Sequence, residues 1–195
     1  AFAGLSAPTR RLAWRLLRAR CAPPPWRLAD DPANLAFITR LRSFGIDPNP
    51  WLDPPAPQLF QAPNGKSVWL AFEHDPLKIF QMGAHFETCL SPGNFNFFSV
   101  FANAADINKH VIYARDSHAR VLGRCLIALT ERGALLTFAA YCHDSRLGFA
   151  GMVASLVARM AQAMKTVIVP SGRVPCLVAS NWYDDGPRDL CQRFE

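Results

Sequence analysis

The chain has 195 residues and a formal net charge of +6 at pH 7; half of its residues are hydrophobic and 18% are charged. This length and composition suit one domain with a sizeable core and exclude a disordered chain. No apolar run approaches the 18 residues that a bilayer-spanning helix needs, so we expect no membrane segment.

A basic helix is predicted at the N-terminus. Thr9 can cap a helix that runs to about Arg20, and the prolines at 23–25 end it with a stiff linker. We therefore divide the chain into a basic helical arm with its linker, 1–25, and an α/β domain, 26–195. Because the chain does not begin with Met, we expect a fragment of a longer protein, whose other domains are candidate partners.

Much of the positive charge lies on this arm. Arg11, Arg15 and Arg18 share one helical face. Three interpretations stay open for that face: solvation, contact with nucleic acid, or docking on a protein partner.

Three further helix starts are predicted where Asp or Ser precedes Pro. A side-chain acceptor at the N-cap followed by Pro at the first helical position is typical of a helix start. These pairs predict helices over about 31–45, 75–80 and 93–105. The last one is rich in phenylalanine, which indicates burial on more than one side.

The regions between these helices alternate between loop and strand patterns. Residues 47–65 hold six prolines and are predicted to be a loop that covers the core. Period-two hydrophobicity predicts strands over 67–73, 110–115, 120–130 and 134–141. Short turns make the last three antiparallel neighbours.

A helix and a strand close the predicted domain. An apolar stripe at helical spacing predicts a helix over 151–164, followed by a strand at 165–169 and a further short strand at 176–179. The fold class is therefore α/β (α+β), with a mainly antiparallel central sheet and helices on both faces.

The order of elements from 110 to 169 resembles the core of the GNAT superfamily of N-acetyltransferases. The resemblance lies in three strand sequences: Val111-Ile-Tyr-Ala-Arg-Asp, Val121-Leu-Gly-Arg-Cys-Leu-Ile-Ala-Leu and Leu135-Leu-Thr-Phe-Ala-Ala-Tyr. It implies a GNAT-like domain over about 66–185, acetyl-CoA or another acyl-CoA as cofactor, and acyl transfer to an amine.

The resemblance also implies a cofactor site. In that family, backbone amides of the loop before the helix hold the pyrophosphate, in the pattern Arg or Gln, two residues, Gly, one residue, Gly or Ala. From Arg146, this chain has Phe149 at the first glycine position and Gly151 at the second, so the loop is degenerate and Phe149 is expected to obstruct the pyrophosphate. The implied cofactor-binding residues are Phe138, Ala140, Cys142, Arg146, Leu147, Gly148, Ala150 and Gly151.

Tyr183 is the catalytic residue that the resemblance implies. GNAT enzymes often have a tyrosine at this distance beyond the last strand, where it protonates the departing thiolate. A pKa near 10 suits that role, because the acid must keep its proton at neutral pH. The alternative interpretation is a tyrosine that packs against the sheet.

The six cysteines are scattered without a C-x-x-C pair or zinc-like spacing, so we predict no metal site. A chain of this size does not need disulfides, which indicates reduced thiols in a cytoplasmic protein.

Cys89 offers a different chemistry. It lies two residues before the predicted helix start at Ser91, where the helix dipole would stabilise a thiolate. His143 follows the predicted strand at 134–141, and Asp144 or Asp106 could orient it. This set predicts, as an alternative, a cysteine peptidase or amidase. The remaining alternative is a non-catalytic interaction module of a larger protein.

Overall fold

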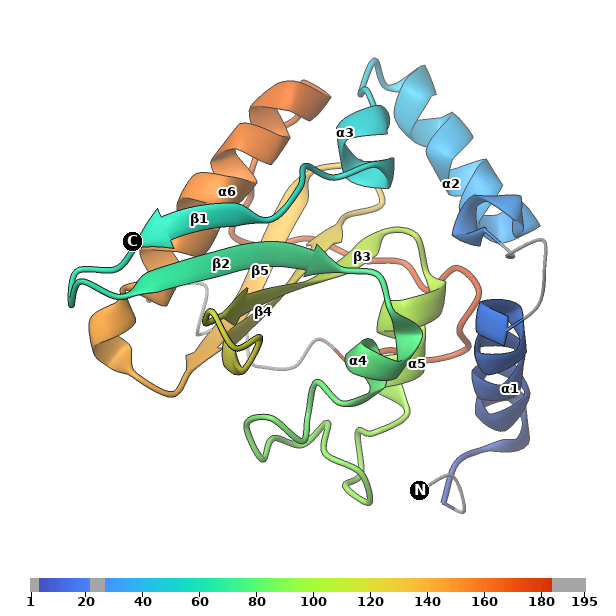
Figure 1. Ribbon diagram of the computed structural model, residues 1–195. Coiled ribbons are helices and arrows are strands. Elements are labelled where there is room, and N and C mark those ends of the chain that lie inside the picture. Colours follow the sequence, from blue (N-terminus) through green and yellow to red (C-terminus); the bar gives the residue numbers. More distant parts are fainter. Residues whose placement is uncertain (1–3, 22–26, 184–195) are drawn as a thin grey trace.

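The computed structural model describes residues 4–21 and 27–183 (Figure 1). Five strands form one antiparallel sheet in chain order, β1-β2-β3-β4-β5. The strands are β1 (Gln58–Gln61), β2 (Ser67–Glu73), β3 (Lys109–Arg115), β4 (Val121–Leu129) and β5 (Leu135–Cys142). The helices are α1 (Ala7–Cys21), α2 (Pro32–Ser43), α3 (Asn49–Leu52), α4 (Pro76–Phe80), α5 (Ser99–Ala105) and α6 (Phe149–Met164), with short 3-10 helices η1 (Leu28–Asp30) and η2 (Ser145–Leu147).

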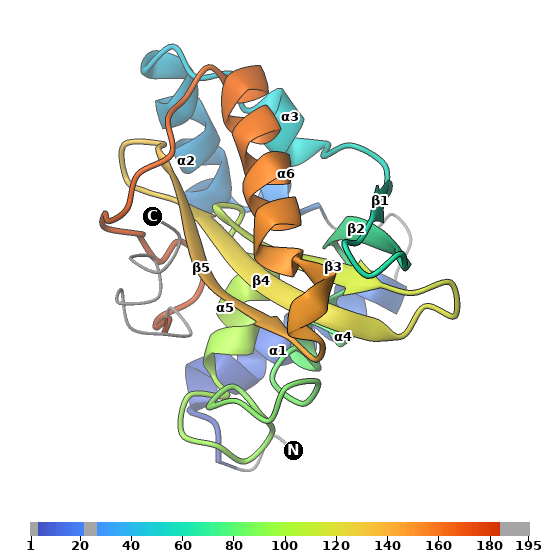
Figure 2. The same ribbon diagram turned by 90° about the vertical axis from the view of Figure 1, so that its left-hand side faces the viewer.

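Helices cover both faces of the sheet, as the sequence predicts. Helices α2, α3 and α6 lie on one face and α1, α4 and α5 on the other (Figures 1 and 2). Side chains of β3 alternate between the two cores: Ile112 packs with α6 and Val111 with α5. The fold class is therefore α+β.

The Asp-Pro helix starts are confirmed. The Asp31 carboxylate accepts the amide hydrogen of Ala33 at 3.0 Å, and Asp75 accepts that of Leu77 at 3.0 Å. Helix α1 is confirmed too, although it begins at Ala7, before the predicted cap.

The helix start at Ser91 is wrong. Helix α5 begins only at Ser99, and residues 91–98 form turns. The Ser91 hydroxyl donates to the carbonyl of Gly83 at 2.8 Å instead of capping a helix, and Gly93 has a φ of +91°, which a right-handed helix does not contain.

The prediction of a loop over 47–65 is also incomplete, because α3 and β1 lie inside it. Both are fixed by distant partners. The buried Trp51 indole of α3 donates to the carbonyl of Ile107 at 2.6 Å, and β1 pairs with β2. Proline content alone does not show such tertiary contacts.

After α6 the chain meets β5 at one isolated parallel bridge, not at a full strand. The Leu135 amide donates to the carbonyl of Val167 at 2.8 Å, and the Val169 amide donates to the carbonyl of Leu135 at 2.9 Å. The predicted strand at 176–179 is wrong: the amides of 177–179 bond to the carboxylate of Asp106 instead of a strand.

Helix α1, the predicted arm, packs on α4 and α5, with Ala13 and Leu16 buried. The Arg20 guanidinium donates to both oxygens of Asp75, at 3.0 and 3.1 Å. The prolines predicted as a linker, at 23–25, lie outside the described residues.

Within the described parts of the chain, no helix is long and apolar enough to cross a membrane. The five cysteines in these parts carry free thiols.

Candidate functional site

A cavity of about 200 Å³ lies between β5, α6 and the segment that follows α6. Most of the side chains that line it are apolar, and most are small or medium-sized. The lining residues are Cys125, Thr137, Phe138, Ala140, Ala150, Val153, Ala154, Val157 and Ile168. Three of the predicted cofactor residues, Phe138, Ala140 and Ala150, are among them.

Two irregularities of β5 open this cavity. The register against β4 shifts, because Cys125 pairs with Ala140 but Ile127 pairs with Thr137, so β5 has one extra residue in a β-bulge. On its other side, β5 meets the segment after α6 only at the Leu135–Ile168 bridge. Beyond this bridge the two segments diverge (Figure 2). Helix α6 closes the wedge between them.

The N-terminus of α6 lies at this cavity, since Ala150 lines it. Gly148 precedes the helix in the left-handed region, with a φ of +64°, and no side chain caps the helix. The first amide of α6 that donates to a carbonyl four residues earlier is that of Met152, and its acceptor is the carbonyl of Gly148 at 3.3 Å. Among the described residues, the amides of 149–151 have no backbone acceptor, and unpaired amides at a helix N-terminus attract anions.

Phe149 does not obstruct this end of the helix, contrary to the prediction. Its side chain is 3% exposed and belongs to the core on the α6 face. The ring packs against Gly123, where a Cβ would lie only 2.9 Å from it. Gly151, in contrast, faces open space.

The remaining predicted cofactor residues, from the end of β5 through the loop to Gly151 of α6, do not line the cavity. The amides of Leu147 and Gly148 donate to carbonyls within their own turn, at 3.0 and 3.3 Å. The Arg146 guanidinium lies 2.9 Å from the Asp144 carboxylate, and this hydrogen bond holds the pKa of Asp144 below its usual value. Burial raises the pKa of the Cys142 thiol, which donates to the Asp144 carbonyl at 3.2 Å.

Tyr183 is not among the residues that line the cavity. Its amide donates to the Ser99 hydroxyl at 2.9 Å, and that hydroxyl donates to its carbonyl at 2.8 Å. The side chain packs against the core of the opposite face, with α5. The geometry therefore agrees with the packing interpretation and gives the acid role no support.

The structure lacks the helix start on which the Cys89 prediction depends. Because α5 begins at Ser99, Cys89 lacks the helix N-terminus on which its reactivity was predicted. His143 stacks on Phe86, with ring centroids 4.4 Å apart.

Neither candidate carboxylate is oriented to serve this set. Asp144 caps η2 and bonds Arg146, and Asp106 is fully buried against Lys109.

Sequence reasoning missed a cluster of cations and aromatic rings beside β5, on the face opposite α6. The buried Arg124 guanidinium lies 4.5 Å from the centroid of the Tyr141 ring and donates to the carbonyl of Met82 at 3.0 Å. The pKa of His85 is lowered, mainly because the side chain is partly buried and also because the positive charges of Arg115 and Arg124 lie near it. The only sequence signal was an arginine inside an otherwise apolar strand.

The chain matches no known protein-family model, and no curated protein is significantly similar to it. The chemistry of the site therefore has to be inferred from its own geometry.

Proposed function

We propose that this chain is a GNAT-like domain that binds acyl-CoA in the cavity between β5 and α6 and transfers the acyl group to an amine. The observation that supports the proposal is the meeting of three features: the bulged edge of β5, the divergence after the Leu135–Ile168 bridge, and the uncapped start of α6. Acyl-CoA would supply an activated acyl thioester.

The residues present suit the parts of such a ligand. The apolar part of the lining fits the hydrocarbon portion of the pantetheine arm. The backbone at the edge of β5 can form hydrogen bonds with the amides of that arm, as it would with an added strand. The amides of 149–151, with the positive end of the helix dipole, suit the pyrophosphate. The open space at Gly151 leaves room for its approach.

Within this proposal, the chain contributes binding and orientation. The backbone of β5 and the start of α6 would align the thioester relative to an incoming amine, which lowers the entropic part of the barrier. The release of the thiolate is not assigned to Tyr183, which is held against α5.

Thermal unfolding with acetyl-CoA tests the proposal. A ligand that binds only the folded state at about a hundred times its Kd stabilises it by about 2.7 kcal/mol, which raises the Tm of a domain of this size by several degrees. Ala154→Leu, which fills the cavity from an exposed helical position, should abolish the rise. Ala158→Leu, one turn further along α6 and outside the lining, should keep it.

The absence of a shift at millimolar acetyl-CoA, or an equal shift in both variants, would refute binding at this cavity. Transfer is measured separately, as release of free CoA thiol in the presence of a panel of amines. A shift without thiol release would leave a binding module and reject the transferase.

A further inference from the structure

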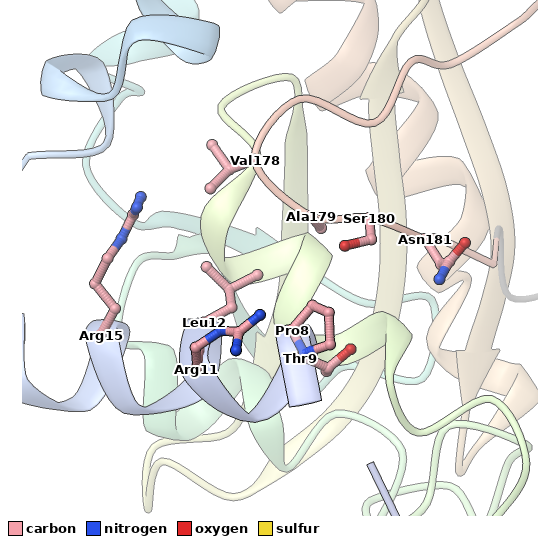
Figure 3. A pocket seen from close by; sticks show the side chains of 9 residues that line it. All are labelled: Pro8, Thr9, Arg11, Leu12, Arg15, Val178, Ala179, Ser180 and Asn181. Carbon is pink, nitrogen blue, oxygen red and sulfur yellow. The ribbon is translucent and has the colours of Figure 1, made fainter. Parts of the chain in front are cut away.

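A second concave region runs along α1, on the face of the sheet opposite the cavity. Its first hollow, of about 220 Å³, lies between α1 and residues 178–181 (Figure 3). A second hollow, of about 350 Å³, continues to the turn at 93–98. Thr9 and Asn181 line both hollows, so they form one continuous depression, here called the α1 groove.

One end of the α1 groove is cationic. Arg11 and Arg15 line the first hollow from the side of α1, across from residues 178–181 (Figure 3). Arg15 pairs with Asp31 at 2.6 Å, whereas Arg11 has no acidic partner in the described part of the chain. Arg18 continues the row of exposed charges along the same helix.

The other end of the groove is aromatic. The second hollow is lined by Phe95, Phe97 and Phe98. Phe97 is buried, but Phe95 projects from the turn with 93% of its surface exposed, so its ring is available to a ligand. Asn94 and Asn181 add hydrogen-bonding amides beside these rings.

We propose that the α1 groove binds single-stranded nucleic acid, with backbone phosphates along Arg11 and Arg18 and a base stacked on Phe95. A groove that combines a cationic track with exposed aromatic rings is the arrangement that binds single strands. Guanidinium groups match phosphate oxygens bidentately, and a row of arginines that extends past the hollow suits a polymer of regular charge.

An acidic peptide fits the groove less well. It would need an enclosed pocket for an apolar anchor, whereas Phe95 offers an open ring face that suits a flat base. This proposal is independent of the acyl-CoA site, because the two regions lie on opposite faces of the sheet.

Fluorescence anisotropy with a labelled single-stranded DNA dodecamer of mixed sequence tests the proposal. Phe95→Ala should weaken binding by about thirtyfold, the middle of the range for loss of one stacked base. Arg11→Gln should weaken it several-fold and make the slope of log K against log salt shallower by about 0.7, measured between about 50 and 200 mM.

Two matched variants serve as controls. Arg132→Gln, in the exposed β4–β5 turn, removes the same charge away from the groove, and Phe44→Ala removes a 52% exposed ring at the end of α2. Both should bind within twofold of the unchanged chain. Equal losses of affinity in Arg11→Gln and Arg132→Gln would overturn the proposal. So would competition by polyglutamate as strong as that by unlabelled single-stranded DNA, or the absence of binding at low salt.

Discussion

At the scale of single residues, a few buried polar groups fix the parts of the chain that surround the α1 groove. The Asp106 and Lys109 side chains are fully buried and 2.8 Å apart. The Asp106 carboxylate also accepts the amide hydrogens of residues 177–179, at 3.1, 2.8 and 2.9 Å. One carboxylate therefore holds the segment that forms a wall of the groove.

Asp106→Asn should destabilise the fold strongly. It removes the charge that compensates Lys109 inside the protein, and breaking a buried pair on one side costs about 3–5 kcal/mol. Chemical denaturation measures the loss, and hydrogen exchange should show faster exchange of the amides of 177–179.

Asp116→Asn is the matched control. Asp116 also accepts two backbone amides and pairs with an arginine, Arg120, but that arginine is 74% exposed. An exposed pair contributes about 1 kcal/mol or less. Equal losses in the two variants would contradict the role given to burial.

His110 gives the fold a dependence on pH. It is buried with its Nε2–H donating to the carbonyl of Trp51 at 2.9 Å, and burial lowers its pKa from 6.5 to about 3. As pH falls below about 6.5, the unfolded chain binds a proton that the folded chain does not, so stability falls, by on the order of 4 kcal/mol at about pH 3.

Denaturation measured from neutral to acid pH checks this dependence. The loss of stability should be shallower in His110→Gln than in the unchanged chain, and His118→Gln, on the exposed β3–β4 turn, should follow the unchanged chain. Parallel curves for all three proteins would show that His110 is not the group responsible.

At the scale of elements, what could be predicted depends on how local the cause is. The start of α2 follows from Asp31 and the proline after it, and β2 follows from its alternation, so both were predictable. Helix α3 depends on Trp51 reaching Ile107, and such a distant partner leaves no mark in the local pattern.

The candidate site divides in the same way. Ala140 and Ala150, which line the cavity, were predicted only through the GNAT resemblance, which implies a ligand site between a strand and the start of the next helix. Val157 and Ile168 could not be predicted, because they line the cavity only after α6 has folded back on the sheet. The direction of the Phe149 ring depends on Gly123, a contact that spacing within the loop does not reveal.

Helix α1 is expected to be integral to the domain in spite of its predicted character as an arm. Leu16→Ala removes a side chain that is 2% exposed between α1 and the α5 face, and such changes cost about 2–5 kcal/mol. Leu35→Ala, the same change at a 50% exposed position on α2, should cost less than about 1 kcal/mol. Similar costs in urea denaturation would mean that α1 does not contribute to the stability of the domain.

At the scale of the whole molecule, the sheet separates two cores and two concave regions. The cavity beside α6 belongs to one face and the α1 groove to the other. Between them, β3 and β4 are buried along nearly their whole length, which gives both regions a rigid support. Sites built on such a support keep their geometry better than sites on loops alone.

The chain-order arrangement of the strands has a consequence for the kinetics of folding. Neighbours β1 and β2 are joined by a short turn, as are β3, β4 and β5, so each group can pair early with little loss of chain entropy. The pairing of β2 with β3 is different, because α4, α5 and the turns between them separate the two strands. Closing that long excursion joins a preformed hairpin to a preformed three-stranded meander, and we expect this docking to limit the folding rate.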